Sequence, residues 1–100
     1  MKSLPKQQIN DAVDLLKTIS GSFRLEILCL LCHRGPMSVT EISQALNSEQ
    51  SATSHQLAKL KSEHLLDSEK TGQIVMYKLA ENQKAELTTK IIKDCGCIKP

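Results

Sequence analysis

The pattern of apolar and polar positions predicts two short, closely spaced helices in the middle of the chain. The first, residues 39–46, has apolar residues at helical spacing on one face: Val39, Ile42, Ala45 and Leu46. Asn47 and Ser48 interrupt this pattern, and the Ser48 side chain suits the N-cap of a second helix that begins at Glu49. Together the two helices predict a helix-turn-helix over residues 38–64.

The second helix carries apolar residues on one side and short polar side chains on the other. The residues expected to face the core are Ala52, Leu57, Leu60 and, at the edge, Ala58. The first two turns hold the polar residues Gln50, Ser51, Thr53, Ser54, His55 and Gln56. Such side chains are poor core material, but their donors and acceptors suit base edges and phosphates. The pattern therefore predicts a recognition helix for double-stranded DNA.

Two segments that flank a short loop with glycine predict a β-hairpin over residues 65–79. Residues 65–69 and 74–79 have the character of strands, and the loop between them, residues 70–73, contains Gly72, where a positive φ costs least. A hairpin directly after a helix-turn-helix is a wing, placed to touch the DNA backbone or minor groove. The side chains expected to assist on phosphates are Lys59, Lys61, Lys70 and Gln73.

Three flanking segments are also predicted to be helices. Residues 5–19 and 81–94 repeat apolar side chains at three- and four-residue steps. Residues 22–33 are apolar nearly all the way round and therefore belong in the core. The expected fold class is mainly α with a β-hairpin wing, a winged helix-turn-helix in the order α-α-α-α-β-β-α. It forms one domain over residues 1–100.

The two terminal helices, residues 5–19 and 81–95, are each amphipathic and too short to stand alone. Pairing them across a two-fold axis would bury both apolar stripes and set two recognition helices about 34 Å apart, one turn of DNA. Alternatively, they cover the core of their own domain. Because half-site recognition needs two copies, the DNA-binding interpretation favours a homodimer on a palindromic operator.

Charge alone does not indicate DNA binding. The chain has 13 basic and 11 acidic residues, a net charge of +2, which is weak for a small nucleic-acid binder. Between residues 48 and 80 the charges cancel. The acids there are Glu49, Glu63, Asp67 and Glu69, and the bases are Lys59, Lys61, Lys70 and Lys78. Any phosphate contact must therefore come from geometry and local placement.

Other classes of protein find little support in the sequence. The first residues lack the pattern of a secretory signal, because Pro5 and polar residues interrupt the apolar ones, and no apolar run is long enough to cross a bilayer. A cytoplasmic protein without a membrane partner is expected. An enzyme is not, since no carboxylate pair, nucleophile–base set or phosphate loop is evident.

With these elements in order, the chain resembles the ArsR/SmtB family of bacterial winged-helix repressors over about residues 10–95. The similar motifs are residues 15–20 with 23–28, Glu41–Leu46, the recognition-helix run Gln50–Leu57 and the strand Val75–Leu79. The resemblance implies a dimeric DNA-binding repressor with a winged helix-turn-helix fold.

The sequence also departs from the family pattern. The family's thiolate metal site needs Cys-x-Cys in the first helix of the helix-turn-helix, where residues 40–44 contain no cysteine. Its other common site uses Asp and His on the last helix, but residues 81–94 contain no histidine. His64 stands where the family usually has glycine before the hairpin, and it tolerates a left-handed backbone better than most residues. The wing also lacks arginine.

The four cysteines are the remaining candidates for a sensor. A cysteine at Cys29 in the core helix, with another near Cys95 at the end of the last helix, resembles the redox- and persulfide-responsive branch of the family. In that branch the two thiols are linked, directly or through extra sulfur atoms, when the repressor leaves DNA. Cys97 is a possible substitute for Cys95, and Cys32 lies on the same helix face as Cys29.

Three other interpretations of the cysteines stay open. Cys29 and Cys32 are also suited to be small core residues, since free cysteine is among the most buried residue types. Thiolates of Cys29, Cys32, Cys95 and Cys97 are suited to bind arsenite, Cd(II) or Cu(I) as an inducer, although no resident cofactor is favoured. Residues 29–33 also match the Cys-x-x-Cys-His haem-attachment pattern, which leaves a small haem or thiol redox carrier as a distant alternative.

Overall fold

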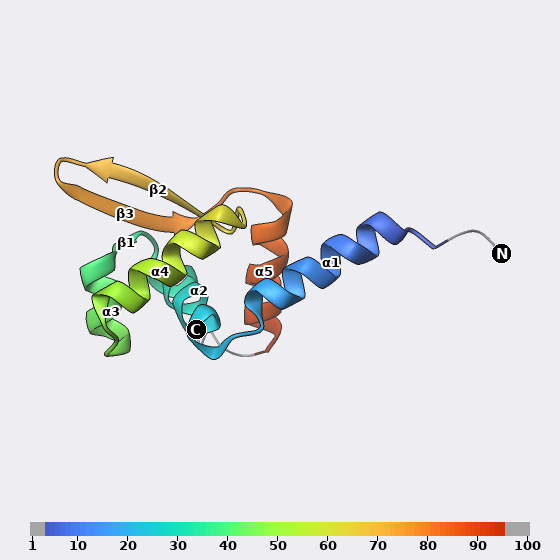
Figure 1. Cartoon of the computed structure of the whole chain (residues 1–100), viewed down its shortest axis with the longest axis horizontal. Coiled ribbons are helices and arrows are strands. Elements are labelled where there is room, and N and C mark those ends of the chain that lie inside the picture. The colour runs from blue at the N-terminus through green and yellow to red at the C-terminus, as the bar shows by residue number, and fades with distance from the viewer. Residues whose placement is uncertain (1–3, 96–100) are drawn as a thin grey trace.

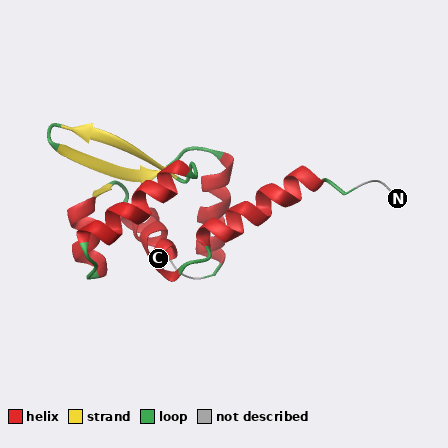
Figure 2. Ribbon diagram, in the orientation of Figure 1, coloured by secondary structure: helices red, strands yellow, loops and turns green. Residues whose placement is uncertain are grey.

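The computed structural model describes residues 4–95, which form five helices and a small antiparallel sheet that lies along one side of them (Figures 1 and 2). The elements are α1 (Lys6–Ile19), α2 (Ser22–Arg34), β1 (Met37–Ser38), α3 (Val39–Leu46), α4 (Gln50–Ser62), β2 (Leu66–Thr71), β3 (Ile74–Leu79) and α5 (Gln83–Asp94). The predicted fold class, mainly α with a β-hairpin wing, is confirmed. The one element that the sequence did not predict is β1.

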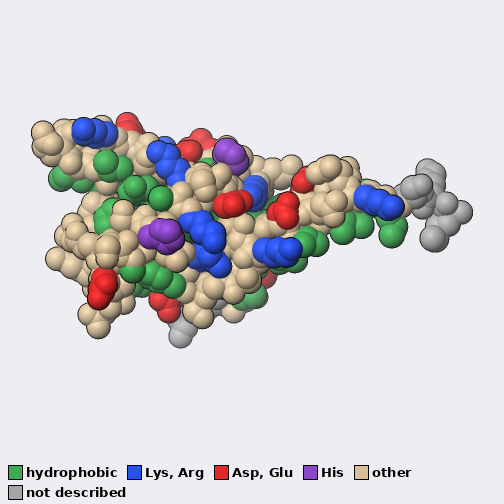
Figure 3. Space-filling view, viewed as in Figure 1, with side chains coloured by type: hydrophobic (Ala, Val, Ile, Leu, Met, Phe, Trp, Pro, Cys, Tyr) green, Lys and Arg blue, Asp and Glu red, His purple; other side chains and the backbone are tan. Residues whose placement is uncertain are grey.

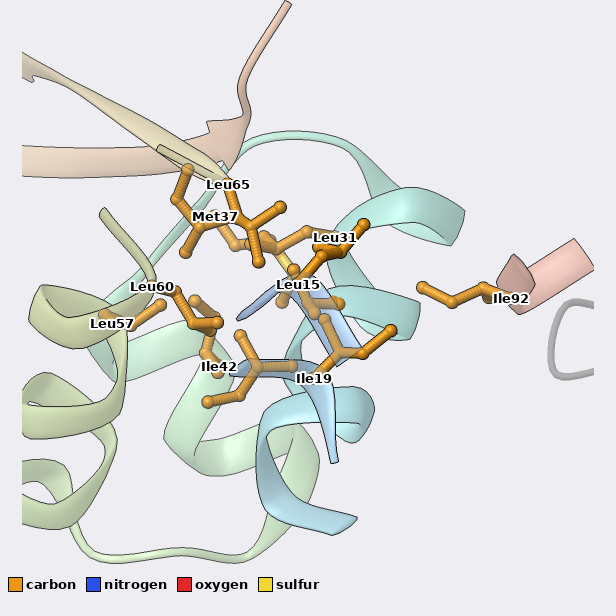
Figure 4. Close-up of a cluster of buried hydrophobic side chains, with 12 residues drawn as sticks. Leu15, Ile19, Leu31, Met37, Ile42, Leu57, Leu60, Leu65 and Ile92 are labelled. Carbon is orange, nitrogen blue, oxygen red and sulfur yellow. The ribbon is translucent and has the colours of Figure 1, made fainter. Parts of the chain in front are cut away.

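The hydrophobic core forms where α2, α3, α4 and the base of the sheet meet. Ile27 and Leu28 of α2, Ile42 of α3 and Leu57 and Leu60 of α4 have no exposed surface. Figure 4 shows the labelled side chains from these helices converging with Leu15 and Ile19 of α1, while Ile92 of α5 reaches the cluster from the far side. The core therefore holds the helix-turn-helix against α2. The apolar residues of α2 contribute to this core, as the sequence predicted.

The sheet has the strand order β1-β3-β2, and every pairing is antiparallel. β1 pairs Met37 with Tyr77 and Ser38 with Met76, so it joins the base of the wing to the start of α3. A strand of two residues is too short to show an alternating pattern, which explains why the sequence gave no sign of it. The same Ser38 is the N-cap of α3 and forms a capping box with Glu41.

The wing is longer and its turn tighter than predicted. Thr71 pairs directly with Ile74, which leaves a two-residue turn at Gly72 and Gln73 instead of a loop over residues 70–73. Gly72 has φ +65°, the conformation for which glycine was expected. Lys70, predicted in the loop, is therefore an exposed residue of β2.

Two helix starts differ from the sequence prediction. α4 begins at Gln50 with Glu49 at the N-cap, so the predicted N-cap at Ser48 is wrong. α5 begins at Gln83, two residues after the predicted start at Glu81, because the Asn82 side chain accepts a hydrogen bond from the backbone N–H of Ala85.

Helix α1 projects from the body of the domain, as Figure 1 shows, and the molecule measures 55 × 28 × 21 Å. Only the C-terminal part of α1 is packed, through Leu15, Thr18 and Ile19. Among the described residues, no helix has the length and apolar content required to span a membrane.

Candidate nucleic-acid interface

Helix α4 lies across the surface of the domain with one face in the core. Its buried residues are Thr53, Leu57 and Leu60, each with no exposed surface, and they recur at the four- and three-residue steps of one helix face. Ala52 and Ala58, which were expected in the core, are both exposed. The helix is thus rotated from its predicted orientation, so that a threonine replaces an alanine in the buried stripe.

Thr53 does not belong to the exposed face, and its predicted contact with DNA is wrong. Its hydroxyl donates to the backbone oxygen of Glu49 at 2.8 Å. The Ser48 hydroxyl lies 2.8 Å from Thr53 Oγ1. Ser48 must be the donor of this bond, because the single hydroxyl hydrogen of Thr53 is already donated to Glu49 O. Hydrogen bonds of Ser48 and Thr53 therefore stabilise the first turn of α4 on its buried side. Burial of a hydroxyl is inexpensive when both its donor and acceptor capacities are satisfied.

The outer face of α4 is left with a compact set of short side chains. Ser51, Ser54 and His55 are exposed in its N-terminal half, with Ala52 and Ala58 beside them. These small side chains allow the helix backbone to approach a partner surface closely. Their hydroxyl and imidazole groups are donors and acceptors of the kind that contact base edges and phosphates.

The two glutamine residues predicted to contact DNA from this face, Gln50 and Gln56, do not both lie fully on it. The Gln50 amide donates to the Thr40 hydroxyl at 3.0 Å and so connects α4 to α3, although the Gln50 side chain is exposed. Gln56 is half-buried, and its Oε1 atom is buried with no hydrogen-bond partner among the described residues. Gln56 is thus turned away from the outer surface, whereas Gln50 lies at its edge.

The side chains that were predicted to contact phosphates lie on α4 itself and on the wing. Lys61 donates to the Ser68 hydroxyl of β2 at 2.6 Å and thereby connects α4 to the wing. Lys59 lies on the opposite flank, towards α1. Lys70 and Gln73 are exposed on the wing. In Figure 3 the basic side chains are interspersed with acids over the visible face and do not form one basic patch.

A groove of about 930 Å³ lies between α1, the C-terminal end of α4, and α5. Leu15, Leu16, Leu87 and Ile91 give it an apolar floor, and Lys59 and Glu63 stand at the side of α4. Leu16 is 55% exposed and Leu87 47% exposed, so both terminal helices present uncovered apolar surface here.

Comparison with known proteins identifies the family. Residues 22–68 match the model for bacterial regulatory proteins of the arsR family. The chain is 33% identical over 89 residues to the HTH-type transcriptional regulator NmtR of Mycobacterium tuberculosis, covering 89% of this chain and 73% of that protein. The chain belongs to the ArsR family. It is therefore a transcriptional regulator with a DNA-binding winged helix, and not an enzyme.

Solved structures of ArsR-type regulators have the same architecture. Reduced HlyU from Vibrio cholerae superposes with a TM-score of 0.81 at 32% identity, covering 93% of this chain and 96% of that one. The transcriptional repressor BigR from Xylella fastidiosa gives a TM-score of 0.84 at 28% identity, covering 95% and 94% of the two chains.

The cysteines of this ArsR-family protein lie away from α4. Cys29 is half-buried on α2 and packs against the core, Cys32 is half-buried one turn later, and Cys95 is the exposed C-cap residue of α5. Helices α2 and α5 pack against each other. Cys97 lies outside the described residues. Over residues 4–95, no three His, Cys, Asp or Glu side chains are grouped closely enough to hold a metal ion.

Two features of the structure could have been predicted from the sequence: the burial of Thr53 in α4 and the N-cap of α5 at Asn82. The buried stripe of α4 follows from counting back from Leu60 and Leu57 by the helical repeat, which reaches Thr53 and not Ala52. An asparagine before an amphipathic run is a usual N-cap, which predicts Asn82 as the residue before α5.

Proposed function

We propose that this protein is a homodimeric repressor that binds a palindromic operator with α4 of each protomer in the major groove. The observation that carries the proposal is the outer face of α4, where Ser51, Ser54 and His55 are exposed while the inner face of the helix is buried in the core. A side chain can discriminate bases only if its helix has a fixed orientation. The wing, with Lys70 and Gln73 exposed, contacts the flanking backbone.

The uncovered apolar residues of the terminal helices support the dimer. Ile9, Val13 and Leu16 of α1 are between 40% and 55% exposed, and Leu87 of α5 is 47% exposed. An isolated domain has no reason to expose four large apolar side chains on adjacent helices, whereas a two-fold contact would remove them from water. The groove between α1 and α5 continues this apolar surface.

Repression follows from occupancy of the operator, which excludes other proteins from the same DNA. The relatives include both repressors and activators of transcription: BigR is a transcriptional repressor, and HlyU of Vibrio cholerae is a transcriptional activator. For this protein we propose steric exclusion, which requires only the contacts of the winged domain with DNA.

We further propose that thiol chemistry of Cys29 and Cys95 controls operator release. Packing of α2 against α5 supports this pairing, because it brings together the helices that carry the two cysteines. One thiolate takes a sulfane sulfur from a polysulfide and becomes a persulfide. The second thiolate then attacks the sulfur attached to the first cysteine, forms a disulfide and releases hydrosulfide. The two thiols lose two electrons, and the sulfane sulfur gains them. With peroxide the same two electrons reduce the oxidant to water.

DNA binding by the purified protein tests the first part of this proposal. A duplex selected by the protein from a random-sequence pool should be retarded in a gel, and its bound form should contain two protomers. Failure to select any duplex, or selection of unpaired half-sites by a monomer, would contradict the proposal.

Titration of that complex with polysulfide, peroxide, arsenite and Cd(II) tests the sensor. Polysulfide or peroxide should dissociate the wild-type complex and link Cys29 to Cys95 by intact-mass and peptide mass spectrometry. The Cys29→Ser variant should stay bound, and Cys32→Ser should respond as the wild type does. Dissociation by arsenite or Cd(II) alone would instead identify a metal(loid)-responsive regulator, and a Soret band on the purified protein would identify a haem protein.

A further inference from the structure

The C-terminal end of α4 is held by the segment that leads into α5. Three consecutive backbone oxygen atoms after α4 accept hydrogen bonds from residues 80–84. Lys84 Nζ donates to Glu63 O at 2.8 Å, Asn82 Nδ2 donates to His64 O at 2.9 Å, and Ala80 N donates to Leu65 O at 2.9 Å. Carbonyl groups at the end of a helix lack partners within it. Here the carbonyl group of the C-cap residue Glu63 finds its partner in Lys84, in the first turn of α5. The next two carbonyl groups are bound by Asn82, the N-cap residue of α5, and by Ala80, which directly follows β3.

Asn82 has two roles in this joint. Its Oδ1 atom accepts from the backbone N–H of Ala85 at 2.8 Å and caps α5, while its Nδ2 atom donates to His64 O. One planar amide therefore binds the turn that directly follows α4 and the first turn of α5 at the same time. His64 has φ +64°, so the chain reverses direction sharply where Asn82 holds it.

The second side chain of the joint reinforces the first. Besides its bond to Glu63 O, Lys84 Nζ lies 3.8 Å from Glu63 Oε2, with the two side chains 30% and 41% exposed. An ion pair this exposed contributes little by itself. The charge-assisted bond to the backbone oxygen is the stronger contact, and it acts on the residue next to the one that Asn82 binds.

We infer that Asn82 is a positioning residue for DNA recognition, because it fixes the orientation of α4 relative to α5. This inference rests on the proposed function, in which α4 reads DNA and α5 belongs to the dimer contact. In such a dimer, the separation of the two recognition helices depends on the angle between α4 and α5 in each protomer. Since the region around α4 carries no net charge, affinity depends on that separation more than on attraction to phosphates.

The test separates the two bonds of Asn82 with a substitution that keeps the net charge. In Asn82→Ser the hydroxyl still caps α5, as serine is a favoured N-cap residue, but the side chain is too short to donate to His64 O. Gln83→Ser is the matched control, because it removes a neighbouring exposed amide that makes none of the three bonds. Circular dichroism and sedimentation should give folded dimers for both variants.

The measurement is affinity for a duplex selected by the wild-type protein, and for versions with one or two base pairs added or removed between half-sites. Asn82→Ser should bind the original spacing roughly three- to tenfold more weakly, as expected for the loss of one hydrogen bond. Its discrimination against altered spacing should fall as well, while its affinity for a single half-site stays that of the wild type. Gln83→Ser should keep the wild-type spacing profile.

Two results would overturn the inference: an unchanged spacing profile in Asn82→Ser, or an equal loss on single half-sites, which would indicate a local defect in α4. If Asn82→Ser does not fold, Lys84→Met removes the neighbouring bond at an accessible site, and it must relax the spacing preference in the same direction. If the wild type selects no paired half-sites, the proposed function fails and this inference fails with it. If the wild type has a spacing preference that both variants retain, only the inference fails.

Discussion

Two surfaces of this protein remain uncovered, and they differ completely in chemistry. The outer face of α4 exposes Ser51, Ser54 and His55, all small or polar, whereas the outer face of α1 exposes Ile9, Val13 and Leu16. Both helices contribute to one core, α4 through its inner face and α1 only through its C-terminal part. The difference indicates two partners of different kinds: a hydrated, polar one for α4, and an apolar one for α1 that is best supplied by a second copy.

The largest effect is expected from a charge in the apolar stripe. Leu16→Glu should abolish the dimer, since burying an unpaired carboxylate costs about 3–5 kcal/mol, or roughly a hundredfold or more in dissociation constant. Sedimentation equilibrium measures this shift. Ile74→Glu is the matched control for oligomeric state, because Ile74 is also an exposed apolar residue, 56% exposed, but it lies at the wing tip. A dimer of unchanged affinity in Leu16→Glu would remove the distinction between the two surfaces.

A smaller effect is expected on the polar face. Replacing Ser54 and His55 together with alanine should weaken binding to the selected duplex by about ten- to a hundredfold, which corresponds to a total loss of about 1.4–2.7 kcal/mol in contacts with bases or phosphates. The dimer and its thermal unfolding should not change, as both side chains are exposed. Fluorescence anisotropy measures the affinity. Binding equal to that of the wild type would show that another face of the protein contacts DNA.

Two adjacent residues, the buried Thr53 and the exposed Ser54, test which side of α4 faces the core. Thr53→Val keeps the shape of the side chain but removes the acceptor of the Ser48 hydroxyl and one of the two donors to Glu49 O, which keeps the backbone N–H of residue 53. The loss should lower the free energy of unfolding by about 1–2 kcal/mol. Ser54→Ala should change it by less than about 0.5 kcal/mol. Urea unfolding at one fixed protein concentration compares them. Equal stabilities would contradict the buried position of Thr53.

The smallest effect is expected on the wing. Lys70→Gln should reduce the dependence of log affinity on log salt by about one per protomer, with little change in sequence preference, if Lys70 contacts a phosphate. Lys90→Gln is the control, because it removes an exposed positive charge on α5 instead. Anisotropy titrations at several salt concentrations give the slopes. An identical slope for the two variants would exclude a specific role for Lys70.

The sequence predicted much of this architecture because helical spacing is visible wherever a helix has one apolar face. Residues 39–46 and 5–19 were assigned in this way, and His64 has the left-handed backbone expected of it. The errors have a shared physical cause. Ala52 was counted as core and Thr53 as surface from their polarity, but helix geometry and two satisfied hydrogen bonds place them the other way round.

The pattern of residues along the chain does not predict contacts between residues that are far apart in the sequence. The pairing of β1 with β3 and the bonds from Asn82 and Lys84 to the end of α4 join segments well separated along the chain. No periodicity reports such contacts. The cysteines are similar, because their spacing indicates candidates while the packing of α2 on α5 gives a reason to pair Cys29 with Cys95.

The short strand β1 divides the wing into two parts with different freedom to vary. It pairs with Met76 and Tyr77, so the base of the hairpin is part of a three-stranded sheet, whereas the stretch from Thr71 to Ile74 is a bare two-stranded ribbon. Inserting one residue in each strand would move the tip by about 3.3 Å and reverse its faces, and inserting two would keep the faces. Insertion of two residues into each strand, between the Lys70–Val75 pair and the tip, should therefore lengthen the wing without disturbing the helix-turn-helix.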